Sequence, residues 1–305
     1  MRTNAVKIAL TRAIDGRMVA PRARPSHSPV ARAFTLVELL VVVGIITILI
    51  ALLFPAIVGV RRQAHAAICA ANLRSIGQAL TMYTQQCGYY PGLGIVDATG
   101  SSAQSYAIWP VRLRIFMGGE HGAFKCPAQD ERCDWKKVAP DPGALGTANE
   151  SHARYGYELG EPLLGSGTPF SYGYNGEGTG RTQYGEHGLG SMLAMDAPSG
   201  PSNRELRATR VRKPAEMVAV TDAYGSGMGD FVVEPNPYWW FNAPGAVHNG
   251  GSNVLFCDGH VQWYRQKDLL VTNNLYVPSE EAVRRMWNND HKVNAGIAYD
   301  REDPG

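Results

Sequence analysis

The sequence lacks the short motifs that mark the commonest hydrolases and nucleotide-binding proteins. No HExxH, P-loop, GxSxG or GxGxxG pattern occurs in its 305 residues, and no internal repeat is present. Its charged content of 18% and apolar content of 45% are those of an ordinary globular protein. We therefore predict a protein that is not an enzyme and that needs no cofactor.

Acidic residues are almost missing from residues 1–33, which contain seven Arg or Lys and only Asp15. A basic segment before a membrane helix indicates the cytoplasmic side. Arg61 and Arg62, on the far side of the apolar run, weaken this asymmetry without reversing it. Because the basic segment has no folding pattern of its own, we expect no nucleic-acid partner.

The chain has one long apolar run, Phe34–Val60, which carries a single charged residue, Glu38. As a helix the run would rise about 40 Å, and about 20 apolar residues already span a bilayer core. We predict that residues 34–60 cross the membrane. A charged residue there costs about 2.5 kcal/mol or more, so Glu38 should have a partner or a function.

The segment Ala33–Glu38 (AFTLVE) resembles the prepilin cleavage and methylation motif of type IV pilins and type II secretion pseudopilins. The resemblance implies that a prepilin peptidase cuts between Ala33 and Phe34, and that Phe34 is then N-methylated. Glu38 is fifth from Phe34, as in that family, and Pro55 falls at the twenty-second position, where a proline is common. The family usually has Gly before the cut. Ala33 is the next smallest residue, so we still expect cleavage.

Cleavage would leave an amino group on Phe34 with a pKa near 8, cationic at neutral pH. That cation is a natural partner for the Glu38 carboxylate of a neighbouring chain, and such a pair would set the axial register between the two helices. Two alternatives remain open. Glu38 could be a protonated or snorkelling residue of a plain anchor, or the run could be a secretory signal, although no small-x-small site follows it.

The helical pattern continues through residues 61–88. Apolar residues recur at spacings of three to five, and Gly88 is a natural helix stop. The stripe comprises Ile68, Leu73, Ile76, Leu80 and Tyr83. We expect it to be the face on which a globular domain packs.

Residues 89–290 are rich in Gly, Pro and aromatic residues and should form that domain, followed by a disordered tail at 291–305. The resemblance implies an α+β fold, with one long helix packed on an antiparallel sheet. The local signals predict strands at Ser171–Asn175 and Met217–Thr221. They also predict a helix at Gln104–Phe116, in which Pro110 must lie in the first turn or break the helix, and a helix capped by Ser279 that continues to Asn288.

A β-hairpin is predicted where two apolar-rich runs, Asn253–Cys257 and His260–Tyr264, flank Asp258-Gly259. Asp-Gly favours a type I′ turn with positive φ at both residues. His248, nine residues and then Asp258-Gly259 match the H-x9-DG pattern of the prepilin-type processing-associated domain. FKCP at 124–127 and SYGYN at 171–175 also resemble segments of such proteins.

His248, Asp258 and His260 could form a metal or acid/base site, but we favour structural roles in which Asp258 forms the turn and His248 bonds to backbone. A structural calcium ion is known in some relatives of the family, and no loop here identifies one. Among the five cysteines, Cys126 and Cys133 are our first choice for a disulfide if the domain faces an oxidising compartment. Separate thiols, or a zinc site with His121, are the alternatives.

The favoured hypothesis is a pilin-like or pseudopilin-like structural subunit that spans the inner membrane once, with its amino terminus in the cytoplasm and its domain periplasmic or surface-exposed. Its partners would be the prepilin peptidase, other pilin or pseudopilin subunits and membrane lipid. A membrane-tethered surface protein that binds a ligand or glycan through Tyr238–Phe241 (YWWF) is the alternative, although we favour a core position for these aromatic residues. A surface hydrolase built on His248 and Asp258 is a third hypothesis.

Overall fold

The computed structural model describes residues 35–96, 105–107, 109–119, 121–133, 147–153, 155–164, 168–179, 187–190, 193–194, 205–225, 231–235, 242–271 and 278–292. The leader with Ala33 and Phe34, the aromatic run 238–241 and residues 293–305 of the tail therefore lie outside the described residues. The chain divides into two compact units, residues 1–53 and 54–305, and each is described by itself.

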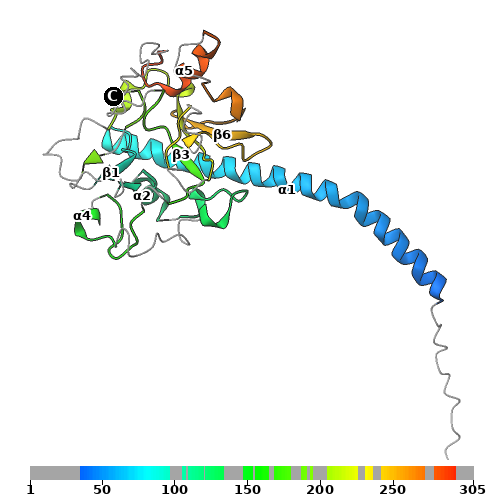
Figure 1. The fold of residues 1–305 in the computed structure, drawn as a ribbon. Helices are drawn as coiled ribbons and strands as arrows, with labels where there is room; N and C mark the ends of the chain where they lie inside the picture. The colour runs from blue at the N-terminus through cyan, green and yellow to red at the C-terminus, as the bar shows by residue number, and fades with distance from the viewer. Residues whose placement is uncertain are drawn as a thin grey trace, which may run out of the picture. The chain divides into compact units, whose positions relative to one another are not determined.

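Helices and strands alternate irregularly along the described chain (Figure 1). The α-helices are α1 (Leu36–Cys87), α2 (Trp109–Arg114), α4 (Glu150–Ala153) and α5 (Glu281–Trp287). The strands are β1 (Gly94–Val96), β2 (Ser105–Ala107), β3 (Tyr172–Tyr174), β4 (Leu193–Ala194), β5 (Val218–Asp222), β6 (Gly251–Phe256) and β7 (Val261–Arg265). The fold is α+β, as predicted.

Helix α1 continues for 52 residues and ends where the sequence predicts. Gly88 follows its last residue with a φ of +78°, and the Gly88 N–H donates to the carbonyl of Thr84 at 2.9 Å. Glycine adopts this left-handed conformation without steric cost, which closes the last turn. Pro55 lies inside the helix and has no N–H to donate to the carbonyl of residue 51.

The second half of α1 supplies one side of the main core. Its buried stripe repeats at spacings of four and three and comprises Cys69, Leu73, Ile76, Leu80 and Tyr83. This corrects the predicted stripe at its start, because Ile68 is 49% exposed and Cys69 is fully buried. A five-residue step from Ile68 to Leu73 turns a helix too far to keep both on one face, whereas the four-residue step from Cys69 keeps them aligned.

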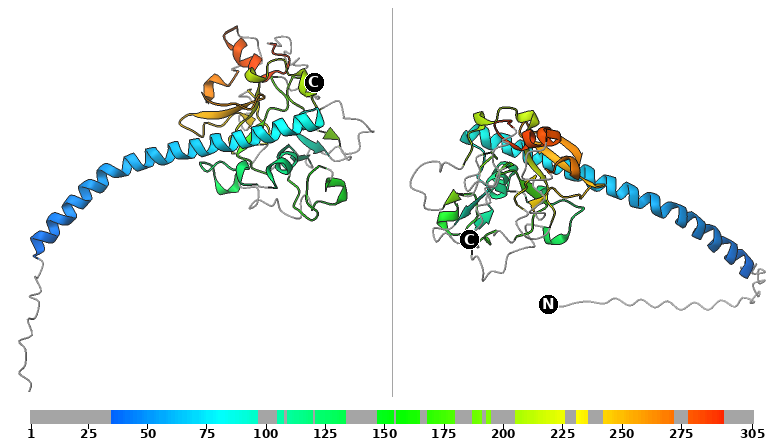
Figure 2. Two further views of the ribbon diagram at one scale, coloured as in Figure 1. Left: turned by 180° about the vertical axis from the view of Figure 1, so that it is seen from behind. Right: turned by 45° about the horizontal axis from the view of Figure 1, so that its top comes forward.

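A four-stranded antiparallel sheet with the order β3-β5-β6-β7 packs beside this part of α1 (Figures 1 and 2). The strands predicted at 171–175 and 217–221 are confirmed as β3 and β5, and the predicted hairpin is β6 with β7. A smaller sheet has the order β2-β1-β4, in which β1 pairs antiparallel with β2 and parallel with β4.

Both faces of the central strands are buried, which explains their nearly continuous apolar sequences. On β6, Leu255 belongs to the main core with α1, whereas Val254 and Phe256 belong to a second cluster with Trp287 of α5. The sheet approaches α1 closely at Gly77, where an added Cβ would lie 2.7 Å from Cδ1 of Leu255, so that side chain would have to shift.

The hairpin turn differs from the predicted type I′ turn. The Gly259 N–H donates to the carbonyl of Phe256 at 2.9 Å, and the Phe256 N–H donates to the carbonyl of His260 at 2.9 Å. Gly259 has the expected positive φ, +93°, but Asp258 does not. The connection is therefore a three-residue loop, 257–259, in which only the last position requires the left-handed conformation.

Two predicted helices begin later than expected. Residues 105–107 of the segment predicted as helix form β2, and α2 begins only at Trp109, with Pro110 in its first turn as predicted. Ser279 lies in a short 3-10 turn, Pro278–Glu280, and is not the cap of α5, whose cap position is occupied by Glu280. Strand pairing of β2 with β1 overrides the helical preference in the first case.

Candidate functional site

The amino-terminal end of α1 is closed by Thr35 and Glu38. The Glu38 Oε2 atom accepts from the Thr35 N–H at 2.9 Å and from the Thr35 hydroxyl at 2.8 Å. In return, the Glu38 N–H donates to Thr35 Oγ1 at 3.2 Å. This is a capping box, in which residues three apart satisfy each other's backbone donors. The carboxylate is thus held at the amino-terminal end of the helix, beside Thr35.

The helix that begins there is long and apolar enough to cross a membrane. Its most apolar 18-residue window has a mean hydropathy of 3.0, and none of that window is buried in the protein. Apolar side chains such as Leu36, Leu52 and Phe54 are between two-thirds and four-fifths exposed. An exposed apolar surface of this extent indicates contact with lipid or with other apolar helices.

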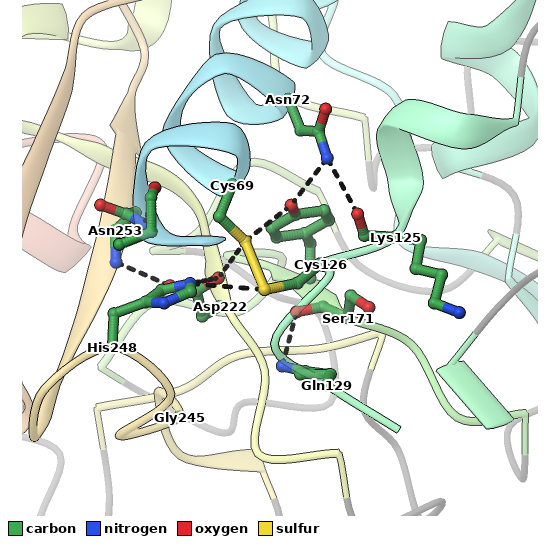
Figure 3. Close-up of a disulfide and its surroundings, with 12 residues drawn as sticks. Cys69, Asn72, Lys125, Cys126, Gln129, Ser171, Asp222, Gly245, His248 and Asn253 are labelled. Carbon is green, nitrogen blue, oxygen red and sulfur yellow. Dashed lines mark hydrogen bonds and ion pairs between the residues drawn. A yellow bond between two sulfur atoms is a disulfide. The ribbon is translucent and has the colours of Figure 1, made fainter. Parts of the chain in front are cut away.

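A disulfide joins α1 to the segment that follows the 3-10 turn Gly122–Phe124. It pairs Cys69 with Cys126, whose Cα atoms are 5.3 Å apart (Figure 3). The predicted pairing of Cys126 with Cys133 is therefore wrong. Cys133 is buried but does not take part in this bond, because the Cys126 side chain points to the buried stripe of α1.

Asp222 and His248 lie against this disulfide (Figure 3). His248 Nε2 is 3.3 Å from Cys126 Sγ and 3.7 Å from Asp222 Oδ1, and Cys69 Sγ is 3.4 Å from the same oxygen. We call these four residues the Cys-Asp-His cluster. Within the described part of the chain it is the set of residues whose side chains could together hold a metal ion, with ligand atoms all within 4.8 Å of one another.

The cluster has almost no contact with solvent. Cys69, Cys126 and Asp222 are fully buried, and His248 is 4% exposed. Burial raises the pKa of the Asp222 carboxyl, because the charged form loses its hydration. The His248 side chain and the Asn253 N–H, which donates to Asp222 Oδ2 at 2.7 Å, oppose that shift. Asp222 is thus a buried acid that depends on a few polar partners.

The structure separates His248 from Asp258 and His260. The main chain of His248 bonds to Gly251, but its side chain contacts Cys126 and Asp222 in the buried cluster, and not a backbone group as predicted. Asp258 and His260 form an exposed pair at the hairpin, with His260 Nδ1 2.6 Å from Asp258 Oδ1 and the His260 N–H donating to that same oxygen. These three residues therefore do not form one site, and Asp258 acts in the turn as predicted.

The zinc alternative built on His121 also finds no support in the described residues. His121 Nε2 lies 3.1 Å from Arg114 Nη1, and His121 is not among the residues that gather around Cys126. The residue that joins Cys126 is instead Cys69, which is 57 positions earlier in the chain.

Residues 29–54 match a known family, described as the prokaryotic N-terminal methylation motif. The chain carries this methylation motif. It is consistent with a prepilin-type pilin or pseudopilin, as the resemblance at Ala33–Glu38 implies. No curated protein and no solved structure matches the chain.

The methylation motif covers the capping box and most of the apolar run, as far as residue 54, but none of the globular domain. Together with the apolar helix it indicates that the chain is anchored in a membrane. Two features of the site escaped the sequence analysis. The capping box has a visible signal, Thr-x-x-Glu before an apolar run. Cys69 could have been found by fitting the stripe to strict spacings of four and three.

Proposed function

We propose that this chain is a pilin-like or pseudopilin-like structural subunit. A prepilin peptidase would cut it between Ala33 and Phe34, and lateral packing of α1 would then assemble the mature chain into a filament of a type II secretion-like or type IV pilus-like machine. The match of residues 29–54 to the methylation motif carries this proposal. The exposed apolar surface of the same helix supports it, because lateral packing needs such a surface.

In this proposal the Glu38 carboxylate has two successive roles. Before assembly it caps its own helix through Thr35. In the filament it would pair with the methylated amino group of Phe34 in a neighbouring chain, which removes two unpaired charges from lipid. The capping box supports this sequence of events because it holds the carboxylate at the end of the helix, where a neighbour's amino terminus can approach.

The globular domain would lie on the non-cytoplasmic side of the membrane. The seven basic residues of the leader support this orientation. The disulfide between Cys69 and Cys126 supports it as well, since disulfides persist in oxidising compartments. A hydrolase built on His248, Asp258 and His260 gains no support, because these side chains do not converge.

We expect the mature protein from membranes to begin at N-methylated Phe34. The measurement is the amino-terminal mass of the full chain expressed with a prepilin peptidase. Ala33→Gly should speed processing, and Ala33→Glu should block it, because a large charged residue replaces the small one at the cut. An intact Met1 start in the wild-type protein, or a cut after the apolar run, would refute the processing step.

We expect a membrane-impermeant maleimide to label Cys87 in spheroplasts before lysis. Cys87 is the last residue of α1 and is exposed. Cys257 should react slowly, because burial raises the pKa of its thiol to about 12 and the thiolate is the reactive form. Cys87→Ser is the matched control and should remove most of the label. Labelling that occurs only after lysis would place the domain in the cytoplasm.

A further inference from the structure

Three sequence segments that are far apart in the chain meet at the Cys-Asp-His cluster. FKCP contributes Cys126, the H-x9-DG segment contributes His248, and SYGYN contributes Tyr172, whose hydroxyl is 3.0 Å from Cys69 Sγ. Helix α1 contributes Cys69 itself. Segments far apart in the chain thus bring two sulfurs, an imidazole and a carboxylate to one buried point beside the helix.

We propose that the Cys-Asp-His cluster binds a zinc-class transition metal ion when its two cysteines are reduced. Two thiolates, one imidazole and one carboxylate are the ligand types that Zn²⁺ takes in proteins, and four protein ligands make the closed tetrahedral set of a structural site. Calcium and magnesium prefer sets of oxygen ligands, so two sulfurs and a nitrogen disfavour them. This proposal does not depend on the proposed filament function.

Three separations between ligand atoms of the cluster match the edges of a tetrahedral site. Zinc bond lengths require ligand atoms to be about 3.3–3.8 Å apart along the edges of the tetrahedron. Three of the edges fall in this range: His248 Nε2 to Cys126 Sγ at 3.3 Å, Cys69 Sγ to Asp222 Oδ1 at 3.4 Å, and His248 Nε2 to Asp222 Oδ1 at 3.7 Å. The two sulfur atoms, which the disulfide joins, would have to move apart, and every ligand atom already lies within 4.8 Å of the others.

Neighbouring groups hold these ligands in position. Asp222 presents Oδ1 to the cluster while its Oδ2 accepts from the Asn253 N–H at 2.7 Å. The Tyr172 hydroxyl contacts Cys69 Sγ, and Asn72 Nδ2 lies 3.4 Å from that hydroxyl while donating to the carbonyl of Lys125 at 2.8 Å (Figure 3). Such outer partners orient metal ligands and typically change metal affinity 10–100-fold when removed.

The disulfide and the metal would exclude each other. A dithiol reductant gives the disulfide two electrons and two protons and becomes a disulfide itself, which leaves Cys69 and Cys126 as thiols. Zn²⁺ then replaces the two thiol protons, which are released to solvent, and forms two Zn–S bonds. Both states tie α1 to the domain at the same place, by a covalent bond in one and through the ion in the other.

The test uses the full chain in detergent micelles, anaerobically, with Zn²⁺ or Co²⁺ as the probe. A phosphine reduces the disulfide and is oxidised to the phosphine oxide, with water as the oxygen source. We expect the reduced chain to bind about one Zn²⁺ and the oxidised chain to bind none at the cluster. With Co²⁺, the reduced chain should show thiolate-to-cobalt charge transfer and the absorption of a tetrahedral ion.

His248→Gln and Asp222→Asn separate metal binding from the structural role of the disulfide, because both leave the two cysteines in place. We expect each to weaken Zn²⁺ binding by more than about 100-fold, beyond the effect of losing an outer partner. His260→Gln, at the exposed hairpin, is the matched control and should bind as the wild type does. A Cys87→Ser, Cys133→Ser, Cys257→Ser triple variant should also bind normally, since Cys69 and Cys126, the two cysteines among the four proposed ligands, remain.

Two results would overturn the proposal. One is wild-type zinc affinity in both His248→Gln and Asp222→Asn. The other is a reduced wild-type chain without thiolate-to-cobalt charge transfer, which decides the question even if a variant does not fold.

Discussion

Replacing Glu38 by Gln is expected to abolish filament assembly while the chain still inserts in the membrane. Gln keeps an oxygen that can accept from the Thr35 N–H and hydroxyl, so the capping box should survive. It removes the charge, so insertion should be at least as favourable as in the wild type. The amino group of Phe34 in the neighbouring chain then loses the Glu38 carboxylate as its partner. Breaking a buried pair costs about 3–5 kcal/mol, more than about 100-fold in association.

The matched control is Thr35→Ala, which removes the capping hydroxyl but keeps the Glu38 carboxylate. Loss of a Thr cap costs about 1 kcal/mol of helix stability, so this variant should insert and assemble. The measurement is chemical cross-linking of oligomers in membranes, together with the fraction of chain that resists carbonate extraction. Wild-type oligomers from Glu38→Gln would mean that the carboxylate is a cap and nothing more. Failure of Thr35→Ala alone would make the cap the determinant of assembly.

Features that depend on neighbours in the sequence were predicted well. The end of α1 at Gly88 and the turn at Gly259 were both predicted from one rule, that glycine alone adopts positive φ without strain. Both residues have positive φ in the structure. The continuous apolar run at 217–221 became β5, buried on both faces. Each of these signals is local, so a single sequence is enough to detect it.

Features that depend on distant pairing were not predictable in the same way. The preference for Cys126–Cys133 followed from their short separation in sequence. Only the packing of α1 beside the 3-10 turn before Cys126 shows that Cys69 is the nearer sulfur. Strand β2 is a similar case, because its pairing with β1 converts the beginning of a predicted helix into a strand.

His248 shows how burial changes an expectation drawn from a motif. On sequence grounds, His248→Gln would be a mild substitution at a residue that bonds to backbone. The backbone bonds to Gly251 are present, yet the side chain is buried between Cys126 and Asp222. Replacing His248 by Gln therefore changes the partner of the buried Asp222 carboxyl. The same variant is now a test of the Cys-Asp-His cluster.

Replacing Cys126 by Ser is expected to cause a larger loss of stability than replacing any cysteine outside the disulfide. The disulfide to Cys69 closes a loop of 57 residues, which on the chain-entropy account stabilises the folded state by about 4 kcal/mol. Loss of that amount should lower the melting temperature of the oxidised full chain by roughly 8–16 °C. Cys69→Ser should have a similar effect, whereas Cys133→Ser should have a small one, since Cys133 is outside this bond.

The pattern of these three variants discriminates between the two pairings. A Cys126–Cys133 bond would make Cys133→Ser as damaging as Cys126→Ser and would leave Cys69→Ser nearly silent. Trypsin gives an independent measurement, because it cuts after Arg62, Arg74, Lys125 and Arg132 and so releases the three cysteines on separate peptides. We expect non-reducing mass spectrometry to recover QAHAAICAANLR linked to CPAQDER. Recovery of CPAQDER linked to CDWK would refute the pairing, and it would remove Cys69 from the cluster in the oxidised chain.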